Sequence, residues 1–190
     1  TALSISPAQA AQCMPDNCSE DTPQRAPPSP AASPPSQRVN RAVSTGSSIT
    51  AAGIVHFSPA NTSDKLTTYA DKGLYFRVAP PDLLQGAAIA KLVADDGATN
   101  VAIIARNDAY GTGLAEVVQS TLEAAGITVS VVKIYEPDAG TFDAEVNEIV
   151  AAGPDSVVVI GFEESSKILR TMVENGAGPR DVAVYGCDGN

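Results

Sequence analysis

The sequence predicts an α/β fold built on a doubly wound parallel sheet. Apolar β-branched runs recur four times after Asn100, helical patterns separate them, and each run stops in polar or glycine residues. Strands separated by helices of this length run parallel, because only a crossover of that size returns the chain to the same edge of the sheet. Sheets of this kind usually have about five or six strands, so we expect this one to be incomplete.

A proline-rich segment precedes the predicted domain. Eight of the 14 prolines fall in roughly the first forty residues, where the apolar residues show no periodicity. Such a composition buries too little apolar surface to offset the entropy lost on ordering the chain. We therefore predict that residues 1–42 are disordered.

The next stretch predicts two strands and a helix. Ile49–Phe57 is a short apolar run that stops at the turn-forming residues 58–62, and Leu74–Val78 alternates as a strand does. Residues 80–82 then end the second strand and begin a helix that closes at Gly97. The apolar residues of this helix are Leu83, Leu84, Ala88, Ile89, Leu92 and Val93.

Four strands and three helices follow. The strands are Val101–Ala105, Val129–Tyr135, Ser156–Gly161 and Val182–Gly186. The helices are Gly111–Gly126, Phe142–Gly153 and Glu163–Gly176. Thr141 is predicted to cap the second helix, and Glu164 or Ser165 to begin the third. The helical stripes expected in the core are Phe142, Val146, Ile149 and Val150, and Ile168, Leu169, Met172 and Val173.

The carboxyl ends of these strands are the predicted location of function. Open α/β sheets bind ligands beyond the carboxyl ends of their strands, because the connecting loops meet there. The four loops concerned are Asn107–Gly111, Glu136–Asp138, Phe162–Ser165 and Cys187–Asn190.

Charge and composition exclude several classes of partner. The net charge of −10 repels nucleic acid and anionic membrane surfaces. No window approaches the roughly 20 apolar residues of a membrane span, and the amino end lacks the pattern of a signal peptide. His56 is the only histidine, and Cys13 and Cys18 lie far from Cys187 in the sequence, so neither a metal site nor a disulfide framework is predicted.

Residues 10–13, Ala-Ala-Gln-Cys, have two interpretations. They are similar to a bacterial lipoprotein cleavage site, at which Cys13 would be acylated. Gln12, however, stands where a small residue is needed, and no apolar segment precedes it. An incidental cysteine in a tail is the favoured interpretation.

Motifs of nucleotide and acyl chemistry are absent or broken. Residues 110–116 follow a strand and open a helix, as a dinucleotide-binding turn does, but Glu116 occupies the place of the third glycine. The glycines are better explained by a tight strand-to-helix turn. Neither a phosphate-binding loop nor a Gly-x-Ser-x-Gly elbow is found. Glu163 and Glu164 are interpreted as carboxylates that favour a helix start.

Three motifs occur together in the order Ser58-Pro59-Ala60-Asn61-Thr62, then Gly73 to Asp82 with Gln85-Gly86, then Asn107 to Leu114. In this order they resemble the type I periplasmic binding proteins of the leucine/isoleucine/valine-binding branch. The resemblance extends from about Val43 to Asn190. It implies two doubly wound lobes that close on a ligand.

The resemblance also implies how the first lobe would hold an amino acid. The Ser-Pro-Ala-Asn-Thr turn would bind the ligand carboxylate through the Ala60 backbone N–H and the Thr62 hydroxyl. An upstream serine, Ser44 or one of Ser47 and Ser48, would add a further hydrogen bond.

The second lobe would supply the opposite side. Tyr110 would lie across the ligand, Phe162 would line the same wall, and Asp188 would pair with the α-ammonium. Closure would then pair both ends of the ligand at once. Phe162 replaces a tyrosine of the best-known members, and Asp188 is one methylene shorter than their glutamate. A phenyl wall without a hydroxyl would tolerate larger apolar groups.

The function implied is that of a solute-binding component of an ABC importer for branched-chain or other apolar amino acids or amides. It would have no enzymatic activity and no cofactor, and its partners would be a small-molecule ligand and, in the intact protein, a transporter permease. It would act in the periplasm or otherwise outside the cytoplasm, where a lipid anchor on the intact form stays an open alternative. A ligand-sensing domain of a receptor or regulator is the second hypothesis, and a Rossmann-like enzyme is the least favoured.

The resemblance divides the chain into three parts. Residues 1–42 are the disordered segment, 43–81 a remnant of lobe one with the crossover, and 82–190 a truncated lobe two. We expect Leu83–Gly186 to form the only stable core, and binding by the chain alone to be weak.

Overall fold

The computed structural model describes residues 48–190, so the segment predicted to be disordered lies outside the described residues. Its main feature is a four-stranded sheet with the order β4-β3-β5-β6, in which every pair of neighbours is parallel. The strands are β3 (Asn100–Arg106), β4 (Thr128–Tyr135), β5 (Ser156–Ile160) and β6 (Ala183–Tyr185). All four were predicted, because β-branched runs bounded by turn residues favour buried parallel strands.

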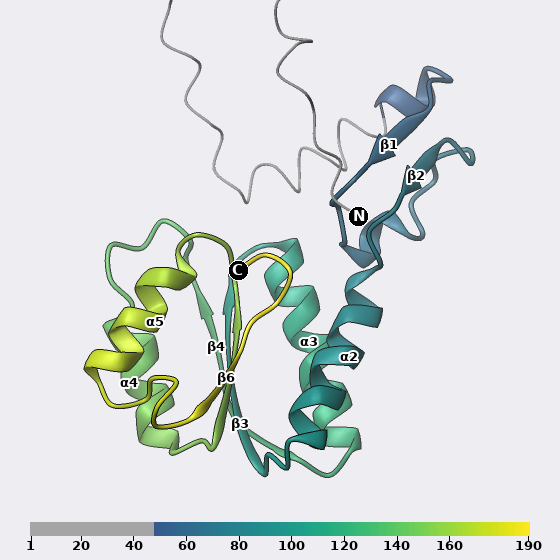
Figure 1. Cartoon of the computed structure of the whole chain (residues 1–190). Helices are drawn as coiled ribbons and strands as arrows, with labels where there is room; N and C mark the ends of the chain where they lie inside the picture. Colours follow the sequence, from purple (N-terminus) through teal and green to yellow (C-terminus); the bar gives the residue numbers. More distant parts are fainter. Residues whose placement is uncertain (1–47) are drawn as a thin grey trace, which may run out of the picture. The chain divides into compact units, whose positions relative to one another are not determined.

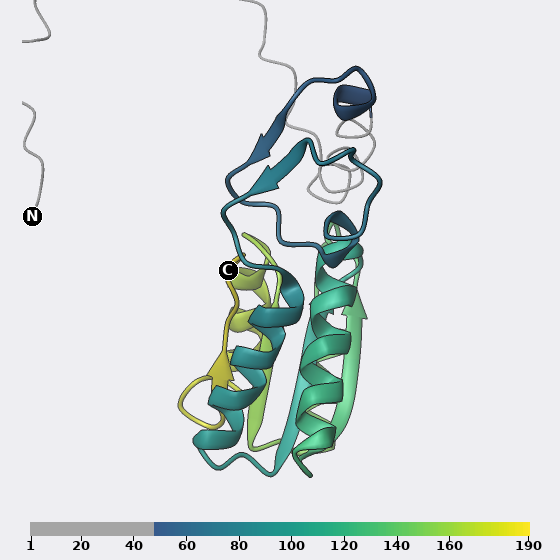
Figure 2. The ribbon, with the colours of Figure 1, turned by 90° about the vertical axis from the view of Figure 1, so that its right-hand side faces the viewer.

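Two helices cover each face of this sheet (Figure 1). Figure 2 shows α2 (Asp82–Asp95) and α3 (Ala109–Ala124) side by side on one face. The other face carries α4 (Asp143–Ala152) and α5 (Ser165–Glu174). Both faces of β3 and β5 are therefore buried, and the predicted doubly wound α/β fold is confirmed for this sheet.

The helices differ from prediction at their ends and edges. Helix α3 begins at Ala109, because the Asp108 carboxylate accepts hydrogen bonds from the first backbone N–H groups. The prediction that Thr141 caps α4 is wrong, since Phe142 stands at that position and makes no side-chain cap. Val150 and Val173 were expected in the core, but they are 39% and 59% exposed, because each lies on the outer margin of its helical stripe.

A separate two-stranded parallel sheet pairs β1 (His56–Ser58) with β2 (Tyr75–Arg77). The prediction of one strand over Ile49–Phe57 is wrong for its first part, because residues 48–51 form a helical turn. A short 3-10 helix, η2 (Asp64–Leu66), follows β1. Phe57 and Phe76 are more than half exposed on this small sheet, so it has little core of its own.

Candidate ligand-binding site

The strand order reverses between β3 and β5. The chain passes from β3 to β4 on one side and then places β5 on the other side of β3. Loops that leave neighbouring strands in opposite directions open a crevice at the carboxyl edge, and open α/β sheets bind ligands there. The loops after β3, β5 and β6 contribute Tyr110, Phe162 and Asp188 to the candidate site.

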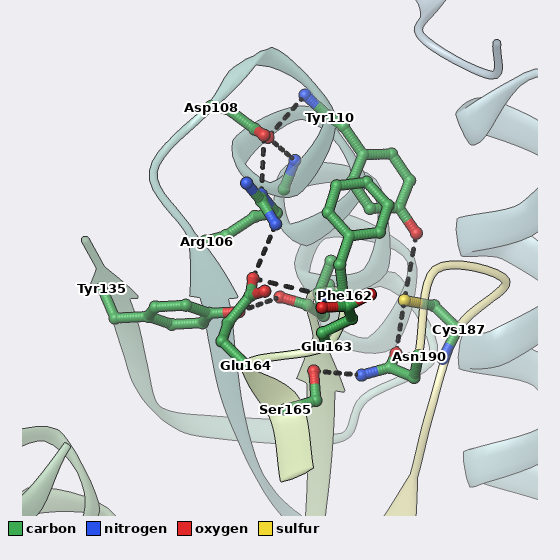
Figure 3. A network of polar contacts seen from close by, with 12 residues as sticks. Arg106, Asp108, Tyr110, Tyr135, Phe162, Glu163, Glu164, Ser165, Cys187 and Asn190 are labelled. Atoms are coloured by element: carbon green, nitrogen blue, oxygen red, sulfur yellow. Dashed lines mark hydrogen bonds and ion pairs between the residues drawn. The ribbon is translucent and has the colours of Figure 1, made fainter. Parts of the chain in front are cut away.

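Arg106, the last residue of β3, is fully buried and joins two of these loops (Figure 3). Its Nε lies 2.6 Å from Asp108 Oδ2, and its Nη1 lies 2.6 Å from Glu164 Oε1. The same Glu164 oxygen accepts hydrogen bonds from Tyr135 Oη at 3.0 Å and from the Phe162 backbone N–H at 3.2 Å. Burial, with the Glu164 charge, raises the pKa of Tyr135, so its phenol is a neutral donor.

Two aromatic rings lie against this ion-pair cluster. Tyr110, from the first turn of α3, stacks on Phe162 with ring centroids 5.3 Å apart and planes inclined by 14°. The guanidinium carbon of Arg106 lies 4.2 Å from the centroid of the Phe162 ring, within the range of a cation–π contact. The Phe162 ring is therefore held by a charged group and by a second ring.

Tyr110 also reaches the loop after β6. Its hydroxyl lies 2.6 Å from Asp188 Oδ1, to which it donates, and 3.0 Å from Cys187 Sγ. The ring is almost wholly buried, whereas Asp188 is exposed at the edge of the loop. Burial, with the neighbouring Cys187, raises the pKa of Tyr110, so the phenol remains protonated and can donate to the carboxylate.

The loop after β6 is itself anchored. The Asn190 side chain accepts from the Cys187 backbone N–H at 2.8 Å and donates to Ser165 Oγ at 2.5 Å. Gly189 passes so close that a Cβ there would lie 2.4 Å from the Gly161 carbonyl oxygen and 2.8 Å from the Phe162 ring. Only glycine fits this approach without a shift of the backbone. Asp188 is therefore held between Cys187, which is bonded to Asn190, and Gly189, which packs against Phe162.

The loop after β1 forms a second element of the site. The Ser58 hydroxyl accepts from the backbone N–H groups of Asn61 at 3.0 Å and of Ala60 at 3.4 Å. Arg77 Nη1 donates to the carbonyl of Thr62 at 3.2 Å and to that of the next residue at 2.9 Å. Serine and arginine side chains from β1 and β2 thus set the conformation of the loop.

These elements enclose a cavity of about 270 Å³. The lining comprises Ala60, Asn61, Thr62, Ser63, Leu66, Tyr110, Phe162, Asp188 and Gly189. Asp188 is the one charged residue among these lining residues, and the two stacked rings give the cavity an apolar wall. Such a cavity suits a small ligand that has a cationic group and an apolar part.

Five of the six residues proposed from the sequence therefore line one cavity, and the sixth, Ser44, lies outside the described residues. Ser47 is also outside them, and Ser48 is not part of the lining. The 136–138 loop contributes nothing to the lining either. Its Glu136 accepts a hydrogen bond from Asn107 at 2.6 Å instead.

Asp82, at the start of α2, is a charged residue near the site that sequence reasoning treated only as a helix start. Its side chain is 1% exposed, and neither carboxylate oxygen has a hydrogen-bond partner of good geometry among the described residues. Burial raises the pKa of Asp82 from 3.8 to about 6, and the nearby Thr62 hydroxyl offsets this only in part. The charges of Asp64 and, to a smaller extent, Asp188 also raise the pKa of Asp82.

The sequence analysis did not predict that Arg106 and Glu164 form a buried ion pair. A charged residue after an apolar run normally marks the point at which a strand reaches solvent. The pairing of Arg106 with residues 2 and 58 positions away depends on the tertiary fold. The only signal in the sequence is a set of opposite charges at the ends of two strands that the topology makes neighbours.

Over residues 48–190, no cluster of three or more histidine, cysteine or acidic side chains is arranged to hold a metal ion. No helix in this part of the chain has the length and apolar character needed to cross a membrane.

Residues 34–182 match the protein family described as the receptor family ligand binding region. A protein of Pseudomonas aeruginosa, the leucine-, isoleucine-, valine-, threonine- and alanine-binding protein, is 28% identical over 130 residues, which are 67% of this chain and 35% of that protein. An uncharacterized protein of Methanocaldococcus jannaschii is 33% identical over 145 residues, 72% of this chain and 34% of that protein. The chain thus spans about a third of the length of these curated relatives.

Solved structures of ABC-transporter proteins have the same fold. The solute-binding protein of R. palustris in complex with 4-hydroxybenzoate superposes with a TM-score of 0.71 at 16% identity, over 78% of this chain and 40% of that one. The substrate-binding protein of Desulfitobacterium hafniense in complex with Leu gives 0.62 at 26% identity, over 76% of this chain and 43% of that one.

Proposed function

Because this chain belongs to the receptor family ligand binding region family, we propose that it carries most of one ligand-binding lobe of a solute-binding protein of an ABC importer. Residues 43–81 then belong to the first lobe and the crossover, and 82–190 to the second lobe. The protein binds its ligand without chemical change, delivers it to a transporter permease and acts outside the cytoplasm. The amino-acid-binding relative of P. aeruginosa and the transporter proteins of similar fold support this assignment.

The proposed ligand is an apolar amino acid, or its amide, with a free α-ammonium group. The observation that carries this proposal is the cavity in which Asp188, held by the Tyr110 hydroxyl at 2.6 Å, faces the loop after β1. Asp188 accepts the ammonium, and the Tyr110 and Phe162 rings contact the apolar side chain. Ala60 and Thr62 also line this cavity. The Ala60 N–H makes only a long bond of 3.4 Å to Ser58 Oγ, and the Thr62 hydroxyl lies near Asp82, so we expect both donors to turn to the ligand carboxylate or carbonyl on binding.

The charge of the lining favours an amino acid over an aromatic acid. The R. palustris neighbour was crystallised with 4-hydroxybenzoate, an anion that has no ammonium group. In this cavity the charged lining residue is an aspartate, which attracts an ammonium and repels a carboxylate. A benzoate would therefore bind more weakly here than leucine or phenylalanine.

Thermal unfolding of the 190-residue chain tests the proposal, since a ligand that binds only the folded state raises the midpoint. We expect millimolar leucine, phenylalanine or leucinamide to raise it and 4-hydroxybenzoate to leave it unchanged. Asp188→Asn should abolish the shift, while the matched variant Asp181→Asn, which alters an exposed aspartate outside the cavity, should retain it. A shift with 4-hydroxybenzoate alone, or none with any compound, would contradict the proposal.

A further inference from the structure

The burial of Arg106 requires an explanation, because a guanidinium group loses much hydration free energy on leaving water. Two carboxylates neutralise it, yet its Nη2 has no hydrogen-bond partner within residues 48–190. Apolar residues of similar volume often stabilise a core as well as a buried ion pair does. Stability of the fold is therefore a weak reason for an arginine at this position.

The contacts of Arg106 converge on one wall of the cavity. Its guanidinium carbon lies 4.2 Å from the centre of the Phe162 ring, and its partner Glu164 accepts the Phe162 backbone N–H. Its other partner, Asp108, caps the helix that begins with Ala109 and Tyr110. Both the ring and the backbone of Phe162, and the start of the helix that carries Tyr110, thus depend on one side chain.

The space for this arrangement is provided by Gly111. A Cβ at this position would lie 2.5 Å from Arg106 Cγ and 2.3 Å from the Arg106 carbonyl oxygen. The first turn of α3 can therefore lie against Arg106 only if residue 111 has no side chain. Arg106 is therefore in close contact with the first turn of α3 as well as with Phe162 and Glu164.

We propose that Arg106 is a positioning residue for the ligand site, which fixes the Phe162 ring, and with it Tyr110, in the orientation that receives the ligand. This inference rests on the proposed function. Arg106 does not line the cavity, so it acts through Phe162 and not by contact with the ligand. A wall held in this way is ordered before the ligand arrives, which lowers the entropy lost on binding.

Arg106→Lys is the variant that tests this role. A lysine keeps the positive charge that the two buried carboxylates require, but its single ammonium cannot reproduce the planar fork or the same contact with the ring. We expect the leucine affinity of the 190-residue chain, measured by isothermal titration calorimetry, to fall roughly five- to tenfold, as is typical of coupled neighbours.

A double-mutant cycle with Phe162→Leu shows whether the effect passes through the ring. If it does, Arg106→Lys should weaken leucine binding much less in the Phe162→Leu background than in the unaltered chain. Val146→Ala, which shortens a buried side chain in the core on the opposite face of the sheet, should lower stability without changing the affinity. Equal effects of Arg106→Lys in both backgrounds, or no effect, would overturn the proposal.

Glu164→Gln provides a second route if Arg106→Lys does not fold. The glutamine oxygen can still accept from Tyr135 and Phe162, and only the charge paired with Arg106 is removed. We expect a smaller loss of affinity that again disappears in the Phe162→Leu background. An unchanged affinity for leucine would speak against Arg106 as a positioning residue.

NMR of the Phe162 and Tyr110 rings tests the role of Arg106 without any ligand, and therefore independently of the proposed function. The chain has 4 phenylalanines and 5 tyrosines, so the ring signals of Phe162 and Tyr110 can be assigned by NMR. Without any ligand, Arg106→Lys should change the chemical shifts of both rings and speed their flipping. If the unaltered chain binds no amino acid, the proposed function fails, while unchanged ring signals in the variant would refute the role of Arg106 independently.

Discussion

The hydroxyl of Tyr110 donates to Asp188 at 2.6 Å, and this bond joins the first turn of α3 to the loop after β6, 78 residues later in the chain. Tyr110 is buried and Asp188 is exposed, so the bond orients the Asp188 side chain while its carboxylate stays accessible to solvent. The carboxylate keeps lone pairs for a ligand, because an ionised aspartate has about four acceptor sites.

Tyr110→Phe should therefore reduce ligand affinity while the fold is retained. The phenyl ring can still stack on Phe162, but Asp188 loses the donor that orients it. We expect a loss of stability of about 1 kcal/mol and a several-fold weaker binding of leucine. Chemical denaturation and calorimetry measure the two effects.

Tyr185→Phe is the matched control for this change. Tyr185 donates to Asp96 at 2.8 Å in a bond of the same type that lies outside the cavity lining. Its loss should leave leucine affinity unchanged. Equal affinities for Tyr110→Phe and the unaltered chain would mean that the Tyr110 hydroxyl has no part in orienting Asp188.

The two glycines of α3 should respond to alanine in opposite directions. A Cβ on Gly111 would clash with the backbone of Arg106, whereas a Cβ on Gly113 has nothing within 4 Å. We expect Gly111→Ala to destabilise the chain by roughly 2 kcal/mol or more, and Gly113→Ala to stabilise it by about 0.5 to 1 kcal/mol through helix propensity. Urea denaturation gives both values, and a stabilising Gly111→Ala would show that Arg106 can move aside.

Asp82 should make the stability of the chain depend on pH in the acid range. Burial raises its pKa from 3.8 to about 6, so between these values the folded state binds more protons than the unfolded state. Stability from this group then falls as the pH rises from about 4 to about 6, and it is constant above that range. The midpoint of Asp82→Asn relative to the unaltered chain should rise over this window in a pH series of thermal melts.

Asp155 gives the opposite sign and serves as the comparison. Burial acts to raise the pKa of Asp155, but its Oδ2 accepts three hydrogen bonds from residues 99 and 100, and hydrogen bonding outweighs burial and lowers the pKa. Its stabilising effect is complete above pH 3.8 and is lost as the pH falls through the depressed folded value. Asp155→Asn should therefore cost stability at neutral pH but less in strong acid. A pH dependence of the same sign for both variants would refute the assignment.

The strands, and the loops that line the candidate site, could be predicted from local patterns. The β-branched run of β3 fixes its strand character, and parallel topology then gathers the strand ends at one edge. Glycine and polar residues after each run marked the loops in which Tyr110, Phe162 and Asp188 lie. Placing their side chains around one cavity required the resemblance to a family, because composition and spacing do not specify it.

What could not be predicted depends on contacts between distant segments. Arg106 has the same local pattern as a residue that leaves the core, and only Glu164 from another loop makes its burial tolerable. The sequence around Asp82 indicates only the start of a helix. Its burial near Thr62 depends on tertiary packing. Val150 satisfies helical periodicity but is exposed, since periodicity gives the direction of a stripe and not the width of the surface that covers it.

The central place of β3 imposes an order of assembly during synthesis. β3 leaves the ribosome before either of its neighbours, then β4 follows after one helix and β5 after a second. We expect the parallel β3-α3-β4 unit to form while the chain is still growing, with one long edge of β3 open until β5 arrives. During that interval Arg106 has Asp108 but not Glu164, so we expect the wall of the cavity around Phe162 to be among the last parts of the molecule to form.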